Sequence, residues 1–287
     1  MPPRLPMWMR RSLPPAAEGR RIQRLLGRLE LHTVCEEARC PNRTACWHEG
    51  AAAFLILGDA CTRDCRFCAI PHDPRPAPPD PAEPARLADA AAALGLRHVV
   101  VTSVTRDDLP DGGAAQFVAV IREIRARLPG AAVEVLVPDF GGNPAALDAV
   151  LAERPDIFNH NVETVERLHP AVRPQADYRR SLAVLRHAAD TGARTKSGLM
   201  LGLGETDDEL REALADLRRA GVALLTLGQY LAPSAAHHPV ARHVPPAEFD
   251  AWGEEARAMG FASVASGPEV RSSYHAGELA SAERGTA

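Results

Sequence analysis

Short apolar runs alternate with longer Ala-, Leu- and Arg-rich segments along most of the chain. The apolar runs predict strands at 52–58, 98–103, 132–139, 156–163, 195–203 and 224–231. Helical spacing predicts helices near 84–94, 114–128, 144–152, 179–191, 207–220 and 246–259, and an earlier one over 21–31. About six strand–helix units therefore follow an N-terminal segment, 1–20, that is rich in Pro and Arg and expected to be irregular.

Repeated strand–helix units predict a parallel sheet with helices outside it. A complete barrel of this kind takes eight units and about 250 residues, more than this alternation provides. We therefore expect an α/β fold of the incomplete (β/α)6 barrel type, open along one side, with a doubly wound sheet as the alternative. The expected division by role is an N-terminal extension at 1–50, the partial barrel at 51–262 and a C-terminal tail at 263–287.

Composition narrows the class of protein. The 287 residues are 46% hydrophobic, enough to bury one large core. A net charge of −4 argues against a nucleic-acid binder, and no apolar stretch is long enough to cross a bilayer. The Arg-rich start resembles a transit peptide, but its prolines would break an amphipathic helix, so a cytoplasmic protein is expected.

All six cysteines lie between Cys35 and Cys68, and the rest of the chain has none. A disulfide framework is typical of small secreted domains, which this chain does not resemble. Clustered cysteines in such a chain indicate ligands of a metal or an iron–sulfur cluster.

Cys61, Cys65 and Cys68 have the spacing C-x3-C-x2-C directly after the first predicted strand. In parallel barrels, loops that leave the carboxyl ends of strands build the active site. Three thiolates can hold three irons of a [4Fe–4S] cluster and leave the fourth iron open to the amino and carboxylate groups of S-adenosylmethionine (SAM). The alternative is a zinc knuckle completed by His72, but Phe67 before the last cysteine is typical of radical SAM enzymes.

Cys35, Cys40 and Cys46 form a second triplet, C-x4-C-x5-C. Three thiolates without a fourth cysteine imply a second cluster with another kind of ligand, and the spacing leaves a structural and a catalytic role equally open. The C-terminal run 265–276 offers the hydroxyls of Ser272 and Ser273, although serines there also suit a terminal turn.

Together these strings resemble the lipoyl synthase family over about residues 4–276. The resemblance rests on RLPMW, TVCEEARCPN, GDACTRDCRFC, VVVTSVTRDDLPDGGA, VEVLVPDFGG, DIFNHNVETVERL, TKSGLMLGLGE, LTLGQYLAPS and VASGPEVRSSYHA. The paired triplets with RSSY are specific to that family, whereas biotin synthase shares only the C-x3-C-x2-C type of motif. Departures are small: Ala45 stands where the family often has Glu, and Ala52 where Thr is usual.

The resemblance implies two [4Fe–4S] clusters and SAM as cofactors. Cys61, Cys65 and Cys68 would hold the cluster that cleaves SAM to a 5′-deoxyadenosyl radical. The auxiliary cluster would be held by Cys35, Cys40, Cys46 and the catalytic Ser273, and consumed as the sulfur donor. Sulfur would enter at C6 and C8 of an octanoyl group on a lysine of a lipoyl carrier domain (an E2 subunit or the glycine cleavage H protein), with flavodoxin or ferredoxin as electron donor.

Polar residues on the predicted strands are candidates for SAM contacts. Along 156–163, the period of two places Asn159, Asn161 and Glu163 on one face. Asn161, Glu163 and Lys196 suit the ribose, carboxylate or ammonium of SAM, and a satisfied polar network at the barrel rim is the alternative. The residues of 106–108 are expected to cap the next helix instead of binding ligand.

Other functions compete with the lipoyl-forming enzyme. One is another radical SAM sulfurtransferase. A two-cluster electron-transfer protein would need neither an open iron nor a barrel, and ferredoxin-type modules carry a fourth cysteine per cluster. A zinc-stabilised binding module is a further alternative.

Overall fold

The structure is a computed structural model that describes residues 6–9, 17–48, 51–273 and 276–277. Its strands are β1 (His32–Thr33), β2 (Ala53–Ile56), β3 (His98–Ser103), β4 (Ala132–Leu136), β5 (Ile157–Asn159), β6 (Thr195–Leu201), β7 (Leu224–Gln229) and β8 (Ser263–Gly267). Its α-helices are α1 (Ala17–Arg28), α2 (Val34–Glu37), α3 (Arg43–His48), α4 (Glu83–Ala93), α5 (Ala114–Arg127), α6 (Pro144–Ala152), α7 (His169–Val172), α8 (Tyr178–Asp190), α9 (Asp207–Arg219) and α10 (Pro246–Ala258). Short 3-10 helices are η1 (Met7–Met9), η2 (Phe140–Gly142) and η3 (Glu166–Leu168).

The strands follow one another in the sheet in chain order, from β1 to β8. The ladders β2–β3, β3–β4, β6–β7 and β7–β8 are parallel, and β1 is antiparallel to β2. A doubly wound sheet would reverse its order at a switch point, so that alternative is wrong. The incomplete barrel is confirmed, with β8 and the short β1 added to the six predicted strands.

The chain folds as two compact units. The N-terminal unit comprises Leu13–Arg63 and Ala69–Phe158. The C-terminal unit comprises Met1–Ser12, Asp64–Cys68 and Asn159–Ala287. The division by role into 1–50, 51–262 and 263–287 stays a prediction.

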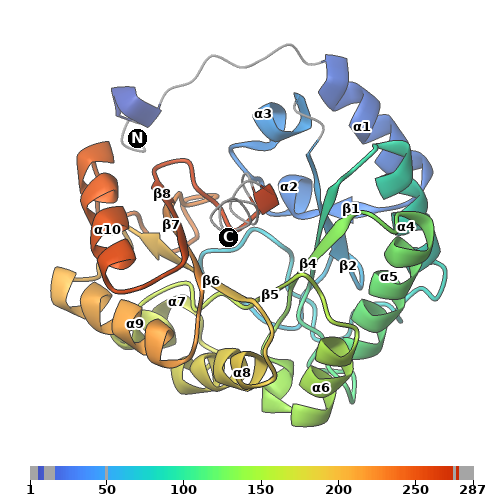
Figure 1. Cartoon of the computed structure of the whole chain (residues 1–287). Helices are drawn as coiled ribbons and strands as arrows, with labels where there is room; N and C mark the ends of the chain where they lie inside the picture. Colours follow the sequence, from blue (N-terminus) through green and yellow to red (C-terminus); the bar gives the residue numbers. More distant parts are fainter. Residues whose placement is uncertain (1–5, 10–16, 49–50, 274–275, 278–287) are drawn as a thin grey trace. The chain divides into compact units, whose positions relative to one another are not determined.

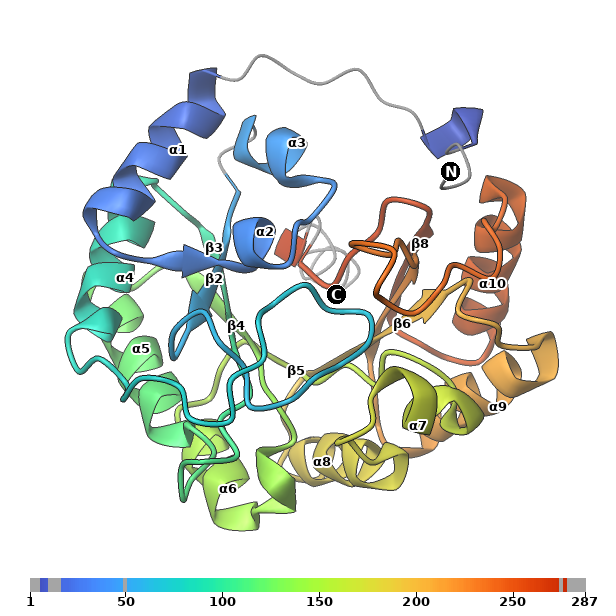
Figure 2. The same ribbon diagram turned by 180° about the vertical axis from the view of Figure 1, so that it is seen from behind.

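In the N-terminal unit, helices α4, α5 and α6 lie outside strands β2, β3 and β4 (Figure 1). Strand β2 is buried along its whole length, which explains its continuous apolar run. Seen from behind, β1 and α2 lie next to β2 (Figure 2). The first long helix begins at Ala17, four residues before the predicted start, and buries Ile22 and Leu26.

In the C-terminal unit, α8, α9 and α10 lie outside β6, β7 and β8 (Figure 1). Leu199, Leu201, Leu225 and Leu227 pack into the hydrophobic core beneath these helices. The register of β6 with β7 pairs Gly198 with Thr226, so small and polar residues alternate with these leucines. On the opposite face of the two strands, Gly198 and Thr226 are small, whereas Lys196, Met200 and Leu224 are long.

The predicted strand at 156–163 is shorter in the structure. Strand β5 ends at Asn159, and Glu163 has a φ of 71°, which breaks the extended run. No helix in the described ranges is long and apolar enough to cross a membrane.

Candidate functional site

Cys61 closely follows β2, in the N-terminal unit. Its Sγ accepts hydrogen bonds from the backbone N–H of Arg63 at 3.4 Å and of Thr105 at 3.3 Å. The Thr62 hydroxyl donates to the Thr105 carbonyl at 2.9 Å and fixes the same pair of loops. These two donors hold the Cys61 sulfur between the two loops.

Arg63 holds this loop from below through two aspartates. Its guanidinium donates to Asp107 at 2.7 and 2.8 Å and to Asp139 at 3.0 and 2.7 Å. Arg63 and Asp139 are both buried, and the two carboxylates raise the pKa of Arg63 against the effect of its burial. Arg63 is not among the residues predicted from the sequence, although it lies between two of the predicted cluster ligands.

The capping role expected for residues 106–108 is wrong. Asp107 binds Arg63, and Asp108 accepts from Arg106 at 2.8 Å. Helix α5 begins after Gly113, and Asp111 accepts from the backbone N–H of Gly113 and Ala115 at its start. A motif with three aspartates offers several candidate caps, and spacing alone did not distinguish them.

Cys65 and Cys68 belong to the C-terminal unit, where backbone bonds hold their segment. Arg66 donates its N–H to the Val172 carbonyl at 2.8 Å and accepts from the N–H of His238 at 2.8 Å. His237 Nε2 bonds to the Cys68 carbonyl oxygen at 3.0 Å. The segment is thus fixed by residues at 172 and 237–238, which sequence spacing did not connect to it.

Cys35, Cys40 and Cys46 lie in the helical arm of the N-terminal unit. Thr33 caps α2, its hydroxyl accepting from Glu36 N at 3.3 Å, and Cys35 follows inside that helix. Cys40 donates its N–H to the Cys35 carbonyl at 3.2 Å, and Cys46 lies on α3. Burial raises the pKa of the Cys35 thiol to about 11, so its thiolate requires a positive partner such as iron.

None of the six cysteines, all of which lie in the described part of the chain, forms a disulfide. Within the described part of the chain, no three His, Cys, Asp or Glu side chains are grouped as ligands of one metal ion.

Asn161, Glu163 and Lys196 converge in the C-terminal unit, together with Ser272. The Asn161 amide donates to Glu163 Oε1 at 3.1 Å and to the Ser272 hydroxyl. Lys196 Nζ donates to the Ser272 carbonyl at 2.6 Å. The structure thus joins the three predicted SAM-contacting residues to the tail, which the sequence pattern did not predict.

The same residues fit a polar ligand such as SAM. Asn161 Oδ1 is buried and has no hydrogen-bond partner among the described residues, so it can accept from a ligand hydroxyl or ammonium. A Cβ at Gly198 would lie 3.0 Å from this oxygen, so glycine keeps the space beside it open. Burial raises the pKa of Glu163, and the Arg173 charge and the Asn161 hydrogen bond partly offset the effect.

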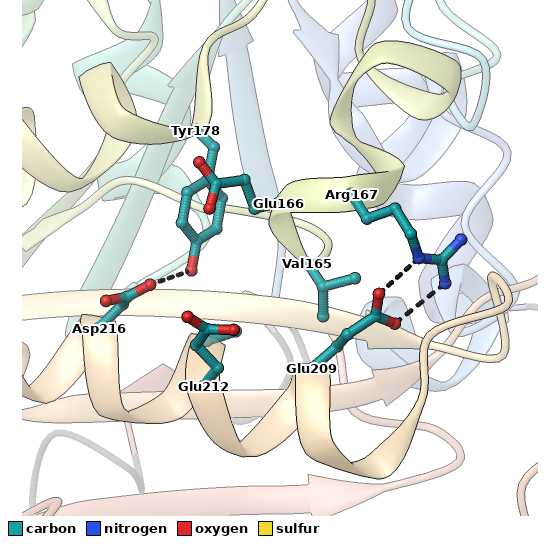
Figure 3. A pocket seen from close by; sticks show the side chains of 8 residues that line it. Val165, Glu166, Arg167, Tyr178, Glu209, Glu212 and Asp216 are labelled. Atoms are coloured by element: carbon teal, nitrogen blue, oxygen red, sulfur yellow. Dashed lines mark hydrogen bonds and ion pairs between the residues drawn. The ribbon is translucent and has the colours of Figure 1, made fainter.

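A separate pocket of about 300 Å³ lies among η3, α8 and α9 (Figure 3). Tyr178 donates to Asp216 at 3.0 Å, and Arg167 binds Glu209 through two contacts. Its lining contains none of the predicted site residues, so it is not the candidate reaction site.

Sequence comparisons identify the family. The model of the radical SAM superfamily matches residues 55–217, and that of the N-terminal domain of lipoyl synthase matches 2–40. Lipoyl synthase of Methylococcus capsulatus is 59% identical over 282 residues, covering 97% of this chain and 87% of the relative. That of Geobacter sulfurreducens is 57% identical over 275 residues, covering 95% and 90%.

The chain belongs to the lipoyl synthase family. A further relative also aligns over nearly its full length. The lipoyl synthase of Chlorobium phaeovibrioides is 54% identical, covering 96% of this chain and 97% of the relative.

Solved structures of other proteins have a similar fold. HydG, a maturase of the [FeFe]-hydrogenase, gives a TM-score of 0.59 at 16% identity, over 73% of this chain and 50% of HydG. Methylornithine synthase (PylB) gives 0.52 at 15% identity, over 75% and 66%. These two structures share the fold of this chain, and the radical SAM assignment rests on the family match over residues 55–217.

Proposed function

We propose that the protein is a lipoyl synthase that inserts two sulfur atoms, at C6 and C8 of an octanoyl group on a lysine of a lipoyl carrier domain. The observation that carries the proposal is the pair of cysteine triplets, one on the arm before β2 and one after it, in a chain of this family. An electron-transfer protein would need only cluster ligands, whereas this chain adds a radical SAM barrel.

Cys61, Cys65 and Cys68 are the proposed ligands of the SAM-cleaving [4Fe–4S] cluster. When bound, the cluster and SAM supply a radical able to remove hydrogen from an unactivated carbon. The chain contributes the position of its ligands: the N–H groups of Arg63 and Thr105 hold the sulfur of Cys61, and His237 fixes the backbone of Cys68. Asn161 and Glu163 are the proposed contacts for the polar groups of SAM, with Lys196 beside them.

Cys35, Cys40, Cys46 and Ser273 are the proposed ligands of a second cluster, which is the sulfur-donating substrate. A serine oxygen is a harder ligand than thiolate and suits iron–sulfur centres less well, so it allows the iron it holds to leave. The fixed arm of α2 and α3 keeps the cysteines in place. The carrier domain is the proposed protein partner, with flavodoxin or ferredoxin as electron donor.

The test is anaerobic reconstitution with iron and sulfide, followed by reaction with SAM, a reductant and an octanoyl-lysine peptide. The expected products are 5′-deoxyadenosine and a peptide carrying two added sulfurs. An electron-transfer protein would give neither product, and a zinc module would not take up iron. Release of 5′-deoxyadenosine without a dithiolated peptide on any octanoyl substrate would indicate another radical SAM sulfurtransferase.

A further inference from the structure

Lys196 is the only lysine in the chain. The other 32 of its 33 basic residues are arginine, so position 196 is the exception to a uniform choice. The Lys196 side chain is fully buried. A lysine ammonium is a compact charge, whereas a guanidinium is planar and carries five N–H donors that all need partners when buried. The site therefore calls for a small cation.

That cation contacts the C-terminal tail. Lys196 Nζ donates to the Ser272 carbonyl at 2.6 Å, and the Asn161 amide donates to the hydroxyl of the same serine. The backbone holds both donors in place. The Lys196 carbonyl accepts from the His160 N–H at 3.1 Å, and Asn161 is the residue after His160. Two residues far apart in sequence thus bind both polar groups of Ser272.

Glycine at position 228 lets the tail approach strand β7. A Cβ there would meet the Val270 carbonyl oxygen far inside van der Waals distance, and a backbone oxygen cannot rotate away as a flexible side chain can. Val270 also donates its N–H to the Gly267 carbonyl at 3.1 Å, which turns the chain after β8. The tail is therefore seated on the strands by its backbone as well as by Ser272.

We propose that Lys196 and Asn161 are positioning residues that hold the tail at Ser272 and so fix the orientation of the next residue, Ser273. The proposal rests on the proposed function, in which Ser273 ligates the auxiliary cluster. Lys196 acts through its ammonium on a backbone carbonyl, a contact that no substitution at Ser272 itself removes. The two hydrogen bonds from Lys196 and Asn161 to Ser272 together form the Ser272 contact.

The first experiment uses apoprotein labelled with 15N-lysine, which has one Nζ group to observe. In the full chain the Nζ–H signal is expected to be visible, because burial and the Ser272 carbonyl slow its exchange with water. Ending the chain after Val270 should remove the signal, and ending it after Gly277 should leave it unchanged. A signal that survives the loss of residues 271–287 overturns the proposal.

A full-length variant guards against misfolding of the truncated chain. Gly228→Ala should displace the tail and break the charged hydrogen bond from Lys196 to the Ser272 carbonyl. Loss of such a bond should speed amide exchange at Ser272 and Ser273 about tenfold or more. Gly130→Ala is the matched control, because a Cβ there meets nothing within 4 Å. Equal exchange rates in the two variants would contradict the seating of the tail.

The second experiment connects the Ser272 contact to the cluster. Lys196→Met and Lys196→Arg, reconstituted with 57Fe, should lose the Mössbauer signature of a distinct, oxygen-ligated iron, as Ser273→Ala does. Retention of that signature in both Lys196 variants overturns the positioning role. If Ser273→Ala itself keeps the signature, the ligand role in the proposed function fails, while the lysine signal still reports on the Ser272 contact.

Discussion

Arg63 and Asp139 form a buried ion pair through two hydrogen bonds, of 3.0 and 2.7 Å, between the cysteine loop and the end of β4. Asp139 is fully buried, whereas the second partner of Arg63, Asp107, is 43% exposed. Asp139 also accepts from Gly141 N at 3.0 Å. The pair therefore ties the backbone that precedes Cys65 to a rigid turn.

Asp139→Asn should destabilise the apoprotein by about 3 kcal/mol, because it leaves the buried Arg63 charge with one exposed partner. Asparagine keeps the shape and one oxygen for Gly141, but its NH2 group replaces an oxygen that accepts from Arg63, so the loss reports the charge together with one hydrogen bond. Urea unfolding measures it. The matched control is Asp208→Asn, whose carboxylate is 98% exposed beside Arg211 and should change stability by less than about 0.5 kcal/mol. Equal losses in the two variants would refute the importance of the buried pair.

His169 should make the folded protein sensitive to acid. Burial and the Arg173 charge lower its pKa to about 4, and the hydrogen bond of Nε2 to the Val162 carbonyl at 3.0 Å offsets only part of this effect. Nδ1 has no acceptor among the described residues that would stabilise the protonated ring. Between about pH 6.5 and pH 4, His169 is protonated in the unfolded chain but neutral in the folded chain. The free energy of unfolding therefore falls as the pH is lowered through this range.

Between pH 7.5 and pH 5 this histidine should cost about 2 kcal/mol of stability. His169→Gln should therefore lose about 2 kcal/mol less free energy of unfolding than the unchanged protein between these two pH values. Urea unfolding at both pH values measures the difference. NMR titration of the His169 ring in the native protein gives an independent check. A midpoint near 6.5 would contradict the inferred effect of burial.

The iron content tests the number of clusters. Six thiolates in two triplets should hold two [4Fe–4S] clusters, so anaerobically reconstituted protein is expected to bind close to eight irons per chain, as two four-iron clusters require. Iron and sulfide analysis measures the stoichiometry. A value near four, or zinc in either triplet, would overturn the two-cluster assignment.

Cys68→Ala and Cys46→Ala should separate the two clusters. Loss of Cys68 should abolish formation of 5′-deoxyadenosine, because one of three thiolates for the SAM-cleaving cluster is gone. Loss of Cys46 should leave that reaction largely in place and abolish sulfur insertion, since its ligand set is separate. Chromatographic assay of 5′-deoxyadenosine and mass analysis of the peptide measure both. Normal 5′-deoxyadenosine formation by Cys68→Ala means the sites are assigned wrongly.

The strands were predictable where burial imposes a simple pattern. The run at 98–103 is strand β3 in full, because its four central residues are buried on both faces. Strand β8, Ser263–Gly267, was not predicted, because two serines and a glycine interrupt any apolar run. It is recognisable as a strand only through its pairing with β7. Helices α2 and α3 were missed for a related reason, being only four and six residues long.

The candidate site was predictable where chemistry lies in local spacing. The two cysteine triplets are recognisable within 34 residues of sequence. Arg63 meets Asp139 across 76 positions, and Asn161 meets Ser272 across 111, so only the fold brings them together. The single lysine was a signal available in the composition, and it identifies the residue that contacts the tail. The remaining residues of the tail motif, Tyr274 and His275, lie outside the described residues.

Ser273 is expected to decide whether sulfur leaves the auxiliary cluster. Ser273→Ala should spare much of the formation of 5′-deoxyadenosine, which depends on the other triplet, and impair sulfur insertion. Ser273→Cys should give a tighter cluster that releases sulfur less readily, because thiolate matches iron–sulfur centres better than an alkoxide does. The measurement is the mass of the product formed on an octanoyl-lysine peptide over time.

Ser272→Ala is the matched control, one residue away. It removes the hydroxyl that accepts from Asn161 but keeps the backbone carbonyl that accepts from Lys196, so one of the two bonds to the tail remains. Its effect on dithiolated product should therefore be milder than that of Ser273→Ala. If Ser273→Ala forms dithiolated product as fast as the unchanged protein, Ser273 is a turn residue and the fourth ligand of the auxiliary cluster must come from elsewhere.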